Sequence, residues 1–269
     1  MDLLDALIPY VLTFGHNVDH LNLDLDLGED IEVLLVEDEA NTDFCYILNN
    51  NNQVAFGGPK DMGMPLWVML DCAILPTAMI GFMAHSDSID DELWEILELE
   101  DDYEGMVPIS EYCAALAMEP GCVSGFSLHS VVPGHGIATR TKALALAVLG
   151  ATKQVGVTQF NNPAIRVHAR FGPMQILVHR PPVHTHPQDS FVYHLNLPDQ
   201  DMLLEMARGG AEFGVPDRPV GIKWSFDPDS EQDHLRLATH LGRKKKAWIV
   251  SPGWRGTTEG NVIDMILGE

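Results

Sequence analysis

The order of segments between residues 109 and 179 constrains the fold more than any other feature of the sequence. Two strand-like runs flank a Glu-Pro-Gly turn, and a glycine loop leads from the second run into an Ala/Leu-rich helix. A strand, a second helix and a further strand follow. The segments are 109–118, 123–132, 139–150, 154–159, 161–171 and 174–179. A hairpin followed by alternating helices and strands predicts a mixed α/β sheet.

The flanks of this run are expected to add further elements. Residues 1–14 have apolar positions at helical spacing and end at Gly15, which predicts a short helix. An asparagine run at 49–52 lies between apolar runs at 44–48 and 53–56, which predicts a hairpin. Further strands are expected at 31–36, 66–70, 78–84, 191–197 and 247–250, and further helices at 87–102, 202–207 and 232–241.

Charge is distributed unevenly along the chain. The 269 residues carry 39 Asp and Glu against 16 Lys and Arg, a net charge of −23. Residues 1–139 hold 26 of the acids and one base, Lys60, whereas residues 140–269 hold 13 acids and 15 bases. Nucleic-acid binding needs a basic face, so the distribution argues against it. The second half can hold a small anion, and the acidic first half can attract a cationic partner.

Other features predict a cytoplasmic protein that does not bind a membrane. The four cysteines form no Cys-x-x-Cys pair, so reduced thiols are expected rather than a disulfide framework or structural zinc. The N-terminus lacks the basic start of a signal peptide. The apolar run 64–84 is long enough to span a membrane, but it contains Pro65, Asp71 and Pro76, so two buried strands are expected there.

A glycine loop, PGHGIA at 133–138, opens the first central helix. Small residues let backbone N–H groups approach an anion at the positive end of a helix, so phosphate or pyrophosphate is the expected guest. Arg140 and Lys142 follow in the first turns of the helix and would suit an outer phosphate. The loop lacks the Gly-Lys-Ser/Thr of a Walker loop and the third glycine of the dinucleotide fingerprint, so neither class is indicated.

The glycine loop and the helix expected to begin at Asn161 together resemble the GCN5-related N-acetyltransferase (GNAT) superfamily. The family's loop has the form Arg/Gln-x-x-Gly-x-Gly/Ala followed by Ile/Leu and a small residue, and its later helix reads Asn-x-x-Ala-x-x-Leu-Tyr-x-x-x-Gly-Phe. The matching residues are Gly134, Gly136, Ile137, Ala138, Asn161, Ala164, Val167 and Gly172, whereas Val131, His168 and Pro173 depart from the pattern. The resemblance covers roughly residues 76–180 and implies a mixed, mostly antiparallel central sheet flanked by helices.

The resemblance also implies a donor site and a catalytic acid. Acetyl-CoA or another acyl-CoA would be the co-substrate, with its pyrophosphate on backbone amides and its pantetheine arm bonded to Asn161. The implied cofactor-binding residues are Val131, Val132, Gly134, His135, Gly136, Ile137, Ala138, Thr139, Arg140 and Asn161. His168 takes the place of the family's Tyr, which protonates the leaving thiolate. Imidazolium is a stronger acid than phenol, so the exchange is chemically reasonable. No metal is expected.

Acyl transfer to an amine also needs a base, and the central strands offer three candidates. These are Glu111, Tyr112 and His129. Strand alternation places Ser127 and His129 on one face. The acceptor is expected to be a primary amine of a small molecule or peptide, and a cationic amine would be attracted by the acidic half of the chain. The sequence is also compatible with a homodimer.

Two alternatives remain open, and they belong to different classes of function. A protein of this fold can bind CoA without catalysis. A metal-binding protein is the other alternative, because four histidines fall within sixteen positions and His-x-His in an extended segment is a metal-ligand spacing. These histidines are His179, His184, His186 and His194. The expected organisation is an acyl-CoA-binding domain at 1–180, with an N-terminal helix and an acidic insert, and a C-terminal α/β extension of unknown role at 181–269, either an added module or strands that complete the sheet.

Overall fold

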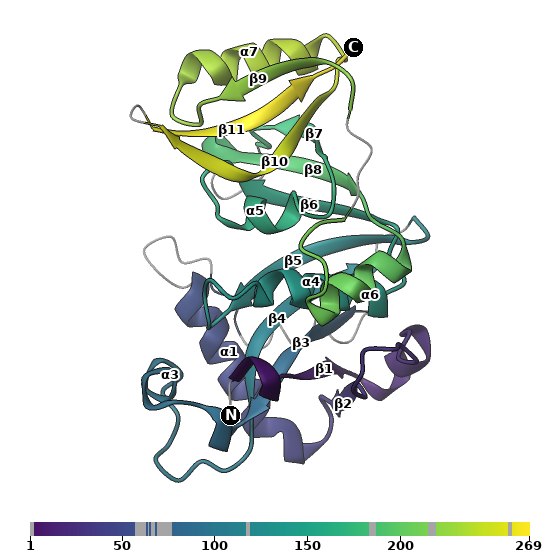
Figure 1. Ribbon diagram of the computed structural model, residues 1–269, viewed down its shortest axis with the longest axis vertical. Coiled ribbons are helices and arrows are strands. Elements are labelled where there is room, and N and C mark those ends of the chain that lie inside the picture. The colour runs from purple at the N-terminus through teal and green to yellow at the C-terminus, as the bar shows by residue number, and fades with distance from the viewer. Residues whose placement is uncertain are drawn as a thin grey trace.

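The computed structural model describes residues 3–56, 63, 65, 68, 77–116, 119–182, 187–214, 219–257 and 260–269. Within these residues, eleven strands form one open sheet in the order β2-β1-β3-β4-β5-β6-β8-β7-β10-β11-β9 (Figure 1). Only β1–β2 and β5–β6 pair in parallel, so the sheet is mixed and mostly antiparallel. The strands are β1 Ile8–Thr13, β2 Glu32–Leu35, β3 Thr77–His85, β4 Met106–Leu116, β5 Cys122–Ser130, β6 Lys153–Gln159, β7 Met174–His179, β8 Ser190–Asn196, β9 Ile222–Phe226, β10 Ala247–Thr257 and β11 Gly260–Leu267.

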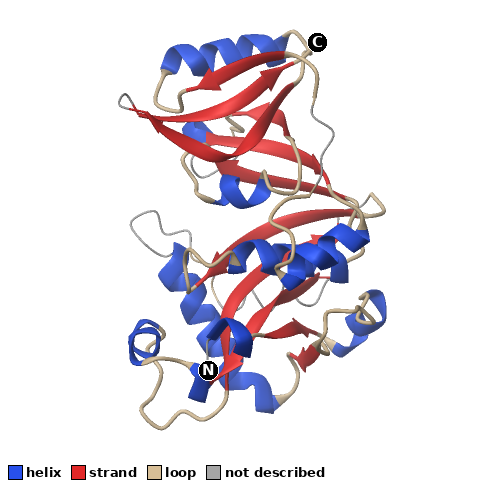
Figure 2. Cartoon of the chain, viewed as in Figure 1, coloured by secondary structure: helices blue, strands red, loops and turns tan. Residues whose placement is uncertain are grey.

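Helices flank this sheet (Figure 2). Two buried clusters lie on opposite faces of β1: Tyr10 and Leu12 belong to the cluster that includes Phe44 of α1, whereas Val11 belongs to the cluster that includes α4. The helices are α1 Thr42–Phe56, α3 Asp91–Ile96, α4 Ile137–Val148, α5 Ala164–His168, α6 Gln200–Arg208 and α7 Glu231–Gly242, with 3-10 turns at Leu3–Ala6, Gly15–His20, Glu39–Asn41, Ser86–Ser88 and Pro187–Asp189.

The central segments confirm the predicted order of strands and helices. The hairpin β4–β5, helix α4 and strands β6 and β7 lie within a few residues of their expected bounds. All residues from Ala143 to Val148 in α4 are buried, because alanines let this helix lie close to β3 and β4 while α6 covers its other side. The predicted elements β2, β3, β8, α6, α7 and β10 are also confirmed, whereas the acidic helix is confined to Asp91–Ile96.

Two N-terminal predictions are wrong. Residues 8–13 form a strand rather than a helix, because β1 is inserted between β2 and β3 and its central residues are fully buried. A short apolar run fits a buried strand as well as a helix, and pairing decides between them. The asparagine run at 49–52 lies inside α1 and not in a hairpin turn. Asn51 Nδ2 donates to the carbonyl oxygen of Pro108 at 2.9 Å, so a tertiary contact takes the place of the expected turn.

Strands β5 and β6 pair only at their beginnings and then diverge. Three parallel pairs join them, and the last described pair is Ser124 with Val155. At the same level β5 carries a bulge, since Gly125 and Ser127 have partners on β4 and Phe126 between them has none in the described register. A bulge bends its strand and here turns β5 away from β6. The resulting V-shaped opening widens toward the carboxyl ends of both strands, where the glycine loop and the segment before α5 begin.

Strands from the C-terminal extension belong to the same sheet as the rest of the chain. β8 lies between β6 and β7, and β10, β11 and β9 continue the sheet beyond β7, with α7 packed on β7 and β10. The expected boundary at residue 180 stays a prediction. Apart from Val68, the strand expected at 66–70 lies outside the described residues, as do most of the apolar run before Thr77, His184 and His186. In the part of the chain that the structure describes, no helix has the length and apolar character needed to cross a membrane.

Candidate functional site

A groove of about 680 Å³ opens where β5 and β6 diverge. The glycine loop and the start of α4 form one side, including Gly134, Gly136 and Thr139. The segment that leads into and through α5 forms the other side, including Asn161 and Val167. The two motifs that the sequence analysis singled out therefore face the same groove.

The glycine loop presents backbone rather than side chains to this groove. Gly134 and Gly136 have φ values of 87° and 75°, in the left-handed region where a side chain is strained. Gly136 caps α4 without a side-chain hydrogen bond, so no cap side chain occupies the first N–H groups of this 12-residue helix. These groups lie at the positive end of the helix dipole and suit an anion.

The backbone N–H groups at the start of the loop already form hydrogen bonds within the protein. The N–H of Val131 donates to the carbonyl oxygen of Ile109 at 3.0 Å, and the N–H of Val132 donates to Ser130 Oγ at 3.3 Å. The exposed His135 ring places its Nδ1 2.9 Å from the carbonyl oxygen of Pro133. At the other end, the N–H groups of Thr139 and Arg140 donate to the carbonyl oxygen of Gly136 at 2.9 and 3.1 Å. The part of the expected donor site that remains for a ligand is therefore the later part of the loop and the residues of α4 before Thr139.

The two basic residues expected near an outer phosphate point elsewhere. Arg140 Nε donates to the carbonyl oxygen of Ala207 in α6 at 3.0 Å, and its guanidinium carbon lies 4.9 Å from the centre of the Phe82 ring. Burial lowers the pKa of Arg140. Lys142 is fully buried in the core. Neither residue lines the groove as the structure describes it.

The groove receives two arginines that the sequence analysis missed. Arg166 of α5 and Arg170 just after it both line the groove, and the guanidinium carbon of Arg170 lies 5.3 Å from the centre of the Phe213 ring. Their spacing of four residues places them on one side of a helical segment, which was the available signal. They give the groove positive charge in a chain whose net charge is −23.

Asn161 lies at the groove as expected, although it does not cap the helix. Asn161 is exposed and lines the groove, whereas Asn162 Oδ1 accepts the N–H of Ala164 at 2.8 Å. The helix predicted over 161–171 is reduced to Ala164–His168. The side chain of Asn161 thus has no capping role in α5 and lines the groove.

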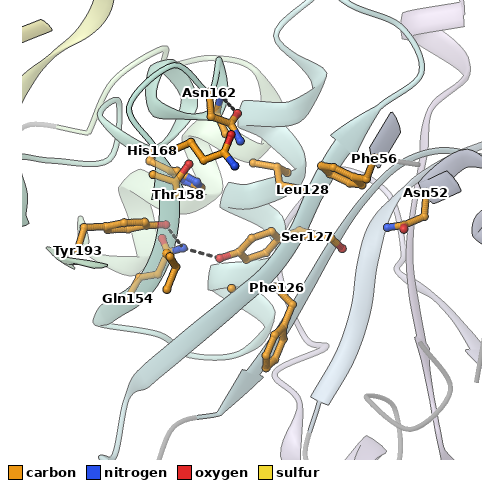
Figure 3. Close-up of a pocket in the computed structure, with 15 residues that line it drawn as sticks. Asn52, Phe56, Phe126, Ser127, Leu128, Gln154, Thr158, Asn162, His168 and Tyr193 are labelled. Atoms are coloured by element: carbon orange, nitrogen blue, oxygen red, sulfur yellow. Dashed lines mark hydrogen bonds between the residues drawn. The ribbon is translucent and has the colours of Figure 1, made fainter. Parts of the chain in front are cut away.

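A second cavity of about 180 Å³ lies near the apex of the V and shares Phe56, Leu128 and Asn162 with the groove (Figure 3). A polar cluster lines it. Gln154 Nε2 lies 2.6 Å from the hydroxyl oxygen of Tyr112 and 3.0 Å from that of Tyr193, and all three side chains are buried. This inner cavity therefore joins hydrogen-bonding groups from β4, β6 and β8.

Two glycines make room for the tyrosine hydroxyls of this cluster. A Cβ at Gly125 would lie 2.2 Å from the hydroxyl oxygen of Tyr112, and one at Gly156 would lie 2.6 Å from that of Tyr193. Burial raises the pKa of both phenols, so they keep their protons at neutral pH. Tyr112 is therefore suited to donate a hydrogen bond and unsuited to act as a base.

His168, the expected acid, lines the inner cavity and is held by a buried lysine. Its Nδ1 lies 2.8 Å from Lys142 Nζ, and its ring centre lies 5.2 Å from that of Tyr193. Burial and the neighbouring Lys142 hold the pKa of His168 well below its ordinary value, and burial lowers the pKa of Lys142. When Lys142 donates to Nδ1, the imidazole hydrogen lies on Nε2. The structure thus favours a neutral imidazole over the expected imidazolium.

Glu111 and His129 meet on the face of the sheet that strand alternation predicts. Ser127 Oγ donates to Glu111 Oε1 at 2.8 Å, and His129 Nδ1 lies 3.3 Å from Glu111 Oε2. All three side chains are buried, but His129 reaches the groove, where its ring meets Phe56 edge to face, whereas Glu111 lines neither cavity. Burial lowers the pKa of His129 to about 4, so the ring is neutral at pH 7 and is a weak base.

The depressed pKa of His129 predicts a loss of stability in acid. Its folded pKa of about 4 lies below the unfolded value near 6.5, so its contribution is complete above pH 6.5 and is lost as the pH falls toward 4. At about 1.4 kcal/mol per pH unit this amounts to about 3 kcal/mol. We expect wild type to lose this much relative to His129→Leu between pH 7 and pH 4 in urea unfolding. The same pH dependence in both proteins would contradict the assignment, and His20→Leu at an exposed site is the control.

The histidines of the alternative metal site are dispersed where the structure describes them. His179 pairs with Phe191 and His194 with Gln175, which places them four residues apart along the β7–β8 ladder, roughly 13 Å. His179 Nε2 instead lies 2.8 Å from Nδ1 of His234 in α7. Among the described residues, no three His, Cys, Asp or Glu side chains are placed to hold one metal ion.

The site as a whole is a groove that shares lining residues with a small polar cavity. Glycine-loop amides and two arginines line the groove, and His168 and the Tyr-Gln-Tyr cluster line the cavity. Comparisons of the chain with protein-family models, curated proteins and solved structures found no match. The functional interpretation therefore depends on the geometry and chemistry of this site.

Proposed function

We propose that the protein is an acyl-CoA-dependent N-acyltransferase of the GNAT type. One observation carries the proposal: the glycine loop and the Asn161 segment, which resemble the family in sequence, line the same groove where two parallel strands diverge. A strand opening of this kind suits the pantetheine arm, which is long and narrow. The proposed fold is GNAT-like, with the additional strands β10, β11 and β9 at one edge of the sheet.

The charge of the groove suits the phosphates of coenzyme A. Its pyrophosphate would lie on the amides at the start of α4, with Arg166 and Arg170 opposite, since guanidinium groups pair well with phosphate oxygens. Its pantetheine arm would run along Asn161 toward the junction of the two cavities. Beyond Ser124, β5 forms no described pairs with β6, so backbone groups on that side are available to bond the arm and to polarise the thioester carbonyl.

The reaction would be direct transfer of the acyl group to an amine. The amine nitrogen forms a bond to the thioester carbon, the carbon–sulfur bond breaks, and the electron pair leaves with the thiolate sulfur. His168 Nε2 would give its proton to the sulfur while Lys142 supplies a proton to Nδ1, a transfer that the 2.8 Å contact between them permits. The proton that the amine nitrogen loses would pass to solvent in the groove, with the neutral His129 ring as a hydrogen-bond acceptor for the amine N–H.

Isothermal titration of the metal-free protein with CoA, dephospho-CoA and pantetheine tests the donor site. We expect CoA to bind in the micromolar range and pantetheine to bind much more weakly, because the anion contacts are lost. Equal affinity for CoA and pantetheine, or no binding of either, would contradict the proposal.

Removing the arginines of the groove is expected to weaken this binding. Arg166→Ala together with Arg170→Ala should raise the Kd for CoA about tenfold or more, since charge-assisted hydrogen bonds to phosphate are lost. Higher salt should reduce the difference. Arg236→Ala is a control with the same type of charge loss, because Arg236 lies over Trp224 in the C-terminal extension. An unchanged Kd in the double variant would contradict the orientation proposed for CoA.

A CoA-binding protein without transferase activity is the second candidate. The neutral His168 favours it, because a neutral imidazole is a poor acid unless Lys142 supplies the proton. Release of free thiol from acyl-CoA in the presence of amines separates the two candidates: a transferase releases thiol, whereas a binding protein retains intact acyl-CoA.

A further inference from the structure

We propose that the inner cavity is an acyl-group subsite for an acyl chain longer than acetyl that carries a neutral hydroxyl or carboxamide. The inference rests on the proposed function and adds to it the class of donor. It starts from two buried polar atoms, Thr158 Oγ1 and Gln154 Oε1, that have no hydrogen-bond partner within the described part of the chain. Both residues line the cavity from one face of β6 (Figure 3).

The volume of the cavity exceeds what acetyl requires. A dry cavity of about 150 Å³ holds benzene, which has six heavy atoms. The inner cavity measures about 180 Å³ and lies beyond the junction where the thioester would be placed. Acetyl would leave most of this space empty, whereas an acyl chain of four carbons with one polar substituent fills it.

The unpaired polar atoms of the cavity determine which hydrogen bonds the substituent on the acyl chain must form. Thr158 is 6% exposed and Gln154 is 0% exposed, so an unmet hydrogen bond at either is costly. Gln154 uses one atom of its carboxamide on Tyr112 and Tyr193, and the other atom faces no described partner. A hydroxyl donates and accepts at once, so it satisfies the Thr158 hydroxyl and either atom of the Gln154 carboxamide. A carboxamide substituent has the same double capacity.

The described lining of the cavity has no charged side chain that could pair with an ionised substituent. No Asp, Glu, Lys or Arg is among the described residues that line it. Lys142 does not line the cavity. Its Nζ lies 2.8 Å from Nδ1 of His168 and 4.5 Å from the centre of the Phe171 ring. A carboxylate on the acyl chain would lose its hydration without gaining an ion pair, so dicarboxylic acyl groups should bind poorly.

Calorimetric binding of a series of acyl-CoA compounds tests the inference without needing an acceptor. CoA, acetyl-CoA, butyryl-CoA, 3-hydroxybutyryl-CoA and succinyl-CoA share the same CoA part. We expect 3-hydroxybutyryl-CoA to bind at least tenfold more tightly than butyryl-CoA, and succinyl-CoA to bind no better than CoA. Equal binding of butyryl-CoA and 3-hydroxybutyryl-CoA, or tightest binding of succinyl-CoA, overturns the inference while CoA binding itself still supports the proposed function. Absence of CoA binding overturns both.

Variants at Thr158 assign the preference to this cavity. Thr158→Val keeps the shape of the side chain and removes the hydroxyl, so the ratio of the two affinities should fall toward one. Thr158→Ser retains the hydroxyl and should retain the preference. Thr152→Val is the matched control, because the Thr152 hydroxyl bonds the carbonyl oxygen of Gly121 at the far end of β6. A preference that survives Thr158→Val and Thr158→Ser alike overturns the assignment to this cavity.

Discussion

Replacing His168 with phenylalanine is expected to lower kcat for acyl transfer by roughly 100- to 10,000-fold while leaving the Kd for CoA nearly unchanged. The ring of His168 lines the inner cavity, next to the place proposed for the sulfur, whereas the groups proposed to bind CoA lie in the outer groove. Without a proton donor, the thiolate must leave unprotonated. Thiol release from acyl-CoA in the presence of an amine acceptor measures kcat, and calorimetry measures the Kd.

Two further variants separate this catalytic effect from loss of folding. The double variant Lys142→Met/His168→Phe removes both members of the buried pair. We expect it to fold and to lack the acid His168. His20→Phe changes an exposed histidine far from the groove and should leave kcat unchanged. Wild-type kcat in His168→Phe would remove this residue from the mechanism. A large rise in Kd would instead assign it to CoA binding.

The stability of the same variants is the second large expected effect. His168→Phe leaves a fully buried lysine without its hydrogen-bond partner, and we expect the free energy of unfolding to fall by about 1–3 kcal/mol. The double variant with Lys142→Met should recover at least half of this loss, because an unbranched apolar side chain then fills the space beside Phe171. Urea unfolding at pH 7 measures all four corners of this mutant cycle.

The coupling energy from the cycle decides whether Lys142 and His168 act as a pair. A double variant no more stable than His168→Phe would mean that the two side chains are energetically independent despite the 2.8 Å contact. The coupling is expected to weaken at high pH, where the amine of Lys142 is neutral in the unfolded chain as well.

The central fold was accessible from the sequence because local signals there agree with the tertiary structure. Glycines at 134 and 136, alanines in α4 and β-branched strands each favour the conformation that the fold requires. The N-terminal region lacked such agreement. Residues 8–13 form the strand β1 because they pair with β2 on one edge and with β3 on the other. The asparagine run lies inside α1, where Asn51 forms a hydrogen bond to Pro108 of β4. Both are tertiary contacts, which the local sequence pattern does not predict.

The sequence singled out two segments that line the groove, but not the charged side chains beside them. The glycine loop and Asn161 both line this groove, and their role in binding CoA stays a prediction. The direction of side chains around α4 was not accessible, because rotation of the helix buries Lys142 and turns Arg140 toward α6. The polar cluster was missed as well, since Tyr112, Gln154 and Tyr193 lie on three strands that meet only when β8 inserts beside β6.

A crystal structure of the protein with bound CoA tests the central claim most directly. We expect the pyrophosphate at the start of α4 between the glycine loop and Arg166, and the pantetheine arm in the opening between β5 and β6 with its sulfur at the entrance to the inner cavity. CoA bound elsewhere, or a strand opening that stays closed to the arm, would contradict the assignment of this groove as the donor site.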